Sequence, residues 1–134
     1  MKQIKADKIK ILIVEDDEDT REIYSKALSL KGFEVITATN GKEGLEKAIK
    51  DIPNLILLDI LMPIMDGFTV LKELRKGDEQ VKKIPVILLT NLSADSEEIV
   101  TKVAETEPVY YIVKASYTIK QLIDKVKEVL HLAS

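Results

Sequence analysis

The stretch Leu55-Ile56-Leu57-Leu58-Asp59 is a short apolar run that ends in an acidic residue. Similar runs rich in Ile, Val and Leu recur at residues 11–14, 35–38, 85–89 and 109–113, and the segments between them carry apolar residues at helical spacing. Parallel strands need connections that cross over the sheet. The alternation therefore predicts an α/β fold of the (βα)5 type, in which a doubly wound five-stranded parallel sheet has helices on both faces.

Capping residues mark the expected helix starts. A cap residue followed three positions later by an acid or amide occurs at Asp19 with Glu22, Asn40 with Glu43, Asp95 with Glu98, and Thr118 with Gln121. Gly32 and Gly77 lie where the first and third helices should end, and glycine tolerates the left-handed conformation there. Residues 33–37 alternate as in an edge strand. The first, third and fourth runs are continuously apolar, as in strands covered on both faces.

Composition limits the chemistry. The 134 residues suit one domain, the 46% hydrophobic residues can fill its core, and a formal net charge of −3 argues against nucleic-acid binding. A membrane span needs about 20 apolar residues, far more than any run here, so we expect a cytoplasmic protein without membrane contact. With no cysteine and one histidine, His131, the sequence excludes disulfides and thiolate sites and leaves oxygen ligands and lysine for any chemistry.

Polar side chains follow four of the predicted strands. Open parallel sheets bind ligands at the carboxyl ends of their strands, so these side chains should gather at one edge. Crowded carboxylates repel one another unless a cation joins them, and an all-oxygen donor set favours Mg²⁺ over zinc or copper. A phosphoryl group would complete the magnesium shell, with an aspartate as nucleophile. The residues concerned are Glu15, Asp16 and Asp17 after the first strand, Asp59 after the third, Thr90 after the fourth and Lys114 after the fifth.

Four fragments resemble the receiver domain of bacterial and archaeal response regulators. They are residues 11–17 (ILIVEDD), 57–67 (LLDILMPIMDG), 85–90 (PVILLT) and 111–114 (YIVK). The most specific of them is the D-x-x-M-P-x-M-D-G pattern at residues 59–67. The resemblance implies a flavodoxin-like sheet with strand order 2-1-3-4-5. It also implies a receiver domain over residues 10–132, an N-terminal extension over residues 1–9 and no output domain.

The resemblance also implies how the acidic residues are used. Asp59 resembles the phosphoacceptor of the family. Asp16, with Glu15 beside it, resembles the acidic pair that holds Mg²⁺ together with Asp59, and the backbone carbonyl of Leu61 would add a further ligand. Asp17 would be a neighbour that is often acidic because it caps the following helix.

The remaining positions are implied to act on the phosphoryl group. Lys114 would pair with the phosphoryl oxygens, Thr90 would be the switch hydroxyl and Tyr111 the switch aromatic residue. Leu61 and Leu92 occupy the two positions that influence water access to the acyl phosphate in the family. Because leucine can neither orient nor admit water, we expect slow loss of the phosphoryl group.

The function that the resemblance implies is signalling and not enzymatic turnover. Asp59 would accept phosphate from a phosphohistidine on a sensor histidine kinase or a histidine phosphotransfer protein in a two-component system or phosphorelay. The surface of the fourth helix, fifth strand and fifth helix would then bind a separate downstream protein, without direct contact to nucleic acid or membrane. The identity of the kinase and of the downstream partner stays open. It also stays open whether the expected monomer dimerises when it is phosphorylated.

Two other functions stay open at this point. A degenerate receiver that binds proteins without phosphorylation is suggested by Ala115 after Lys114, where the family usually has proline, by Asn91 after Thr90, and by the missing glycine before the fifth strand. An aspartate-nucleophile phosphatase of similar topology is less favoured. Its nucleophile would follow the first strand in a D-x-D pattern, whereas here the candidate nucleophile follows the third strand.

Overall fold

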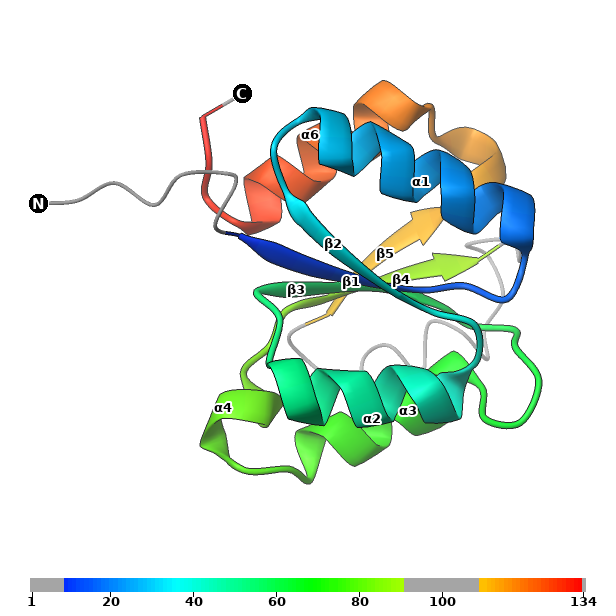
Figure 1. Cartoon of the computed structure of the whole chain (residues 1–134), viewed down its shortest axis with the longest axis vertical. Coiled ribbons are helices and arrows are strands. Elements are labelled where there is room, and N and C mark those ends of the chain that lie inside the picture. The colour runs from blue at the N-terminus through cyan, green and yellow to red at the C-terminus, as the bar shows by residue number, and fades with distance from the viewer. Residues whose placement is uncertain (1–8, 91–108, 134) are drawn as a thin grey trace, which may run out of the picture.

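The structure is a computed structural model that describes residues 9–90 and 109–133 (Figure 1). Its strands are β1 (Lys10–Val14), β2 (Glu34–Ala38), β3 (Leu55–Asp59), β4 (Val86–Thr90) and β5 (Val109–Val113). Its helices are α1 (Glu18–Leu30), α2 (Gly41–Asp51), α3 (Gly67–Arg75), α4 (Glu79–Lys82) and α6 (Ile119–Val129), with a short 3-10 helix η2 (Lys114–Ser116). The helix expected around residues 99–103, its cap Asp95, and Asn91 and Leu92 lie outside the described residues.

The five strands form one parallel sheet in the order β2-β1-β3-β4-β5. This confirms the predicted α/β fold and the strand order, and β2 is an edge strand as its alternating pattern indicated. In the register of the central strands, Val14 lies opposite Leu58, and Asp59 lies opposite Leu89. The carboxyl ends of β1, β3 and β4 are therefore level with one another, which places the polar residues that follow them at one edge.

Helices cover both faces of the sheet, with α1 and α6 on one face and α2, α3 and α4 on the other (Figure 1). Successive strand residues point to opposite faces. Ile11 and Ile13 of β1 join the core under α1 and α6, while Leu12 and Val14 join the core under α2 and α3. All four side chains are fully buried, which explains why the inner strands are apolar throughout.

The start of α1 corrects one capping prediction. The cap is Asp17 and not Asp19, because the Asp17 carboxylate accepts hydrogen bonds from the Thr20 backbone N–H (2.9 Å) and hydroxyl (2.6 Å). Asp19 lies within the first turn of the helix, where an acidic side chain interacts favourably with the helix dipole. The predicted caps Asn40 and Thr118 are confirmed.

The end of α3 corrects another prediction. Gly32 after α1 has the expected left-handed conformation, with φ of 93°, but Gly77 has no positive φ. The chain instead leaves α3 through Lys76 and enters the short helix α4, which Asp78 caps and which no pattern in the sequence predicts. A Cβ atom on Gly77 would lie 3.0 Å from the Val81 side chain, so glycine is explained here by close packing.

Candidate functional site

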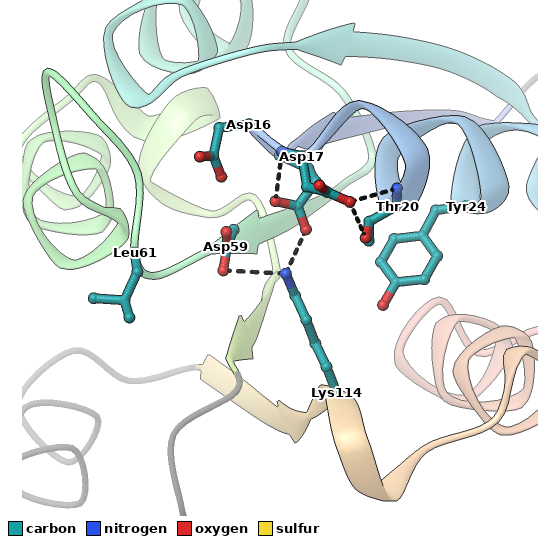
Figure 2. A pocket seen from close by; sticks show the side chains of 8 residues that line it. Asp16, Asp17, Thr20, Tyr24, Asp59, Leu61 and Lys114 are labelled. Atoms are coloured by element: carbon teal, nitrogen blue, oxygen red, sulfur yellow. Dashed lines mark hydrogen bonds and ion pairs between the residues drawn. The ribbon is translucent and has the colours of Figure 1, made fainter.

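The acidic residues after β1 and β3 meet at the carboxyl edge of the sheet (Figure 2). Glu15 continues β1, and its backbone N–H donates to the carbonyl of Ala38 in β2 (3.1 Å). Asp59 is the last residue of β3 and is only 6% exposed. Asp16 is exposed. Carboxylate oxygens of Glu15, Asp16 and Asp59 all lie within 4.8 Å of one another.

Lys114 bridges two of these carboxylates. It begins η2 directly after β5, and its ammonium group contacts Glu15 Oε1 in a hydrogen-bonded ion pair and lies 3.4 Å from Asp59 Oδ1. The Glu15 side chain is fully buried and the Lys114 side chain is largely buried. Lys114 therefore reaches the acidic residues although Ala115, and not proline, follows it in the sequence.

The buried carboxyl group of Asp59 has a raised pKa. Burial, followed by the hydrogen bond and charge of Glu15, raises the pKa of Asp59 to about 7, although Lys114 acts in the opposite direction. Burial alone would lower the pKa of Lys114, but its hydrogen bond with Glu15 and the charges of Asp59 and Glu15 outweigh burial and raise it. Lys114 thus stays cationic, and it compensates only part of the repulsion between the two carboxylates.

The loop between β1 and α1 is held by its own side chains. The backbone N–H of Asp17 donates to Glu15 Oε2 (3.2 Å), and the Asp17 carboxylate caps α1 through Thr20. The hydrogen bonds from the Thr20 side chain and backbone hold the pKa of Asp17 below its usual range. Arg21 of α1 reaches back to this loop, with Nη1 2.9 Å from the carbonyl oxygen of Glu15.

A cavity of about 540 Å³ opens over these groups. Its lining includes Tyr24 and Leu61, the second of which is 58% exposed. Figure 2 shows Tyr24 on α1 beside Lys114 and Leu61 beyond Asp59. Burial, together with the charges of Glu15 and Asp59, raises the pKa of Tyr24, so its hydroxyl stays protonated. The cavity therefore has room for a small group beside Asp59 and Lys114.

The donor set fits a hard divalent cation. Glu15, Asp16 and Asp59 offer oxygen atoms alone, and burial together with the neighbouring Glu15 raises the pKa of Asp59 by more than Lys114 lowers it. Mg²⁺ binds to such oxygen ligands and keeps open positions for water and phosphate. Both oxygens of Glu15 already have partners, namely Lys114 and the Asp17 N–H, so Asp16 and Asp59 are the more accessible ligands.

The structure brings together most of the residues singled out from the sequence. Glu15, Asp16, Asp59, Leu61 and Lys114 line the same cavity. Thr90 is the last residue of β4, is 1% exposed and lies one position beyond the residue paired with Asp59. The backbone of Tyr111 is part of β5, but its side chain lies outside the described part of the structure, as does Leu92.

Three residues at the site were not predicted to belong to it. Thr20 and Tyr24 line the cavity, and Arg21 contacts the loop beneath it. The spacing of Asp17 and Thr20 is itself a helix-capping signal, and placing the cap at Asp17 would have brought the first turns of α1 to the acidic loop. Nothing in the sequence distinguishes Arg21 from an exposed helical arginine.

A family model described as the response regulator receiver domain matches residues 11–127, which is most of the chain. The chain belongs to this family. The resemblance found in the sequence is thereby confirmed, and the protein is a receiver domain of the two-component response regulators. No helix within the described ranges is long and apolar enough to cross a membrane.

This receiver domain is similar to larger proteins. It is 37% identical over 126 residues to a probable transcriptional regulator ycf27 of Pyropia yezoensis, and the match covers 94% of this chain and 49% of the relative. The chain spans about half the length of the curated relatives it matches.

Solved receiver structures share its fold. The chemotaxis protein CheY4 of Vibrio cholerae matches with a TM-score of 0.81 at 31% identity, covering 90% of this chain and 98% of that one. A chain in the CheX-CheY-BeF3-Mg²⁺ complex of Borrelia burgdorferi matches with a TM-score of 0.78 at 28% identity, covering 90% of this chain and 88% of that one.

Proposed function

We propose that this receiver domain accepts a phosphoryl group on Asp59 from a phosphohistidine of a sensor histidine kinase or phosphotransfer protein. The observation that supports the proposal is the position of Asp59 in the lining of an open cavity, beside the acidic loop and 3.4 Å from the Lys114 ammonium group. A carboxylate in this place has a cationic side chain ready for the incoming oxygens and acidic neighbours ready for a metal ion.

The residues divide the chemistry between them. A carboxylate oxygen of Asp59 attacks phosphorus and the P–N bond to the donor imidazole breaks, with its electron pair staying on nitrogen. The imidazole leaves as a neutral ring because its other nitrogen already carries a proton. Lys114 leaves its carboxylate partners to hold the phosphoryl oxygens, which now carry the negative charge it must neutralise. Asp16, Glu15, Asp59 and the Leu61 carbonyl would hold Mg²⁺, which supplies charge neutralisation to the phosphoryl group when bound.

Phosphorylation would change the surface through which the domain binds a partner. The phosphoryl group draws the Thr90 hydroxyl toward it and Tyr111 occupies the space that this movement leaves. The result is a population shift between two packings, driven by a local charge. A separate protein then binds the surface that includes β5 and the helix following it. The CheX-CheY complex of Borrelia burgdorferi supports partner binding as an output of a similar chain.

The test is incubation with a small acyl phosphate and Mg²⁺, followed by intact-mass measurement. The proposal expects the mass of one added phosphoryl group in the parent protein and none in Asp59→Asn. The matched control is Asp66→Asn, since Asp66 is a nearby exposed aspartate that caps α3 and asparagine caps equally well. Absence of the adduct from the parent protein would favour the degenerate receiver, and steady release of phosphate would favour the phosphatase.

A further inference from the structure

We infer that Arg21 is a positioning residue, whose guanidinium holds the backbone carbonyls of Glu15 and Asp16 and so fixes the Asp16 carboxylate for Mg²⁺. The inference rests on the magnesium site of the proposed function and deepens it. Arg21 itself neither lines the cavity nor touches the phosphoryl group, so its effect would pass through the loop it holds.

Arg21 joins α1 to the acidic loop through both its backbone and its side chain. Its backbone N–H donates to the carbonyl of Asp17 (2.9 Å), which is the first bond of the helix. Its side chain folds back in the same direction, and Nη1 lies 2.9 Å from the carbonyl oxygen of Glu15 and 3.4 Å from that of Asp16. One guanidinium nitrogen carries two hydrogens, so a single rigid group can serve two successive carbonyls.

Asp16 depends on this support more than the other acidic residues do. The Glu15 side chain is held by Lys114 and by the Asp17 N–H, and the Asp59 side chain is held by Lys114. Within the described ranges, the Asp16 carboxylate makes no hydrogen bond or ion pair, and Figure 2 draws none. Its position is therefore set by its backbone, whose carbonyl Arg21 contacts.

If Arg21 acts only through its charge, its removal should change the Mg²⁺ affinity in one direction, and if it positions the loop, in the other. A cation beside an acidic metal site repels Mg²⁺, so if Arg21 acted through charge alone, its removal would tighten metal binding. If Arg21 positions the loop, its removal loosens the Asp16 carboxylate and weakens metal binding. Residues that orient metal ligands typically change affinity by about 10-fold or more.

The experiment compares the Mg²⁺ affinity of Arg21→Ala, Arg21→Lys and the parent protein at pH 8. The affinity is measured from the change in the backbone amide resonances of residues 15–17 and 59–61 as Mg²⁺ is added. Lys26→Ala is the matched control, because Lys26 is an exposed cation on the same helix with no contact to the loop. The thermal midpoint without Mg²⁺ verifies that each variant is folded, as expected for a partly exposed helical position where alanine is favourable.

The positioning role predicts that Arg21→Ala weakens Mg²⁺ binding by about 10-fold. It predicts that Arg21→Lys retains part of the affinity and that Lys26→Ala changes little. Affinity in Arg21→Ala that is equal to or tighter than that of the parent would overturn the inference and leave the proposed function intact. A parent protein that does not bind Mg²⁺ at all would remove the metal site of the proposed function and the inference with it. Phosphorylation of Arg21→Ala should recover at saturating Mg²⁺.

Discussion

Asp59 is a carboxyl group whose ionised form the fold disfavours. Burial and the neighbouring Glu15 raise its pKa to about 7, compared with about 3.9 for an unfolded chain. Between these two pH values the folded state keeps a proton that the unfolded state has lost. The stability contributed by Asp59 is thus complete below about pH 4 and is lost as the pH rises through 7.

We therefore predict that Asp59→Asn stabilises the metal-free protein above pH 7. The free energy of unfolding at pH 8 should rise by on the order of 1 kcal/mol, a value below the full pKa shift because asparagine gives up the contact with Lys114. The gain should disappear toward pH 4. Urea denaturation at a series of pH values measures it. A parent protein whose stability increases from pH 5 to pH 8 relative to Asp59→Asn would contradict the raised pKa.

Leu61 lines the same cavity as Asp59. Its side chain lines the cavity and is largely exposed, so it presents an apolar surface where water would have to approach the acyl phosphate. We predict that Leu61→Asn accelerates loss of the phosphoryl group several-fold, because an amide can orient water. The decay of the phosphorylated mass measures the rate. Ile64→Asn, in the same loop, should leave the rate unchanged, and rapid decay in the parent protein would refute the explanation.

The loop between β3 and α3 contains a residue with a strained backbone conformation. Ile64 has a φ of 72°, a left-handed conformation that is unfavourable for a β-branched residue, and its side chain is 76% exposed. Ile64→Asn should raise the free energy of unfolding by about 0.5–1 kcal/mol, because asparagine tolerates this conformation and little buried area is lost. Ile23→Asn, at an exposed helical position, should lower it. A loss of stability in Ile64→Asn would show that the Ile64 side chain has contacts which outweigh the strain.

The first residue of α3 packs against the end of β3. The backbone N–H of Gly67 donates to the Ile60 carbonyl (2.8 Å), and a Cβ atom on Gly67 would lie 2.4 Å from the Asp59 carbonyl oxygen. Backbone atoms cannot yield as a flexible side chain can. We predict that Gly67→Ala lowers the free energy of unfolding by about 1–3 kcal/mol and slows phosphorylation of Asp59.

The control for this change is Thr69→Ala, an exposed substitution in the same turn of α3. Chemical denaturation and the time course of phosphorylation give the two readouts. If Gly67→Ala were as stable and as reactive as Thr69→Ala, the close approach between α3 and Asp59 would not constrain the acceptor.

Elements with a repeated pattern could be predicted from the sequence, and elements fixed by one local contact could not. The inner strands β1, β3 and β4 follow from apolar runs because both faces of the sheet are buried there, and the edge strand β2 follows from its alternating pattern. The cap of α1 was misplaced by two residues, since Asp17 and Asp19 are both acidic and the contact with Thr20 decides between them. The helix α4 has four residues, too few for a helical pattern of apolar side chains.

At the scale of the whole molecule, topology explains why distant residues meet. Asp16, Asp59 and Lys114 are far apart in the sequence, and a parallel sheet brings the carboxyl ends of their strands to one edge. The sequence could therefore predict which residues gather there. It could not predict that Lys114 pairs with Glu15 or that Arg21 supports the loop, because these contacts depend on side-chain geometry.

Asp59 is the residue that we propose carries the phosphoryl group. The most direct test of this is reduction of the phosphorylated protein with borohydride, which converts an aspartyl phosphate to homoserine, followed by peptide mass mapping. We predict modification at residue 59 in the peptide that contains residues 55–67, dependent on Mg²⁺ and retained in Asp66→Asn. Modification at Asp16 or Asp17 instead, or none at all in protein that binds Mg²⁺, would contradict it.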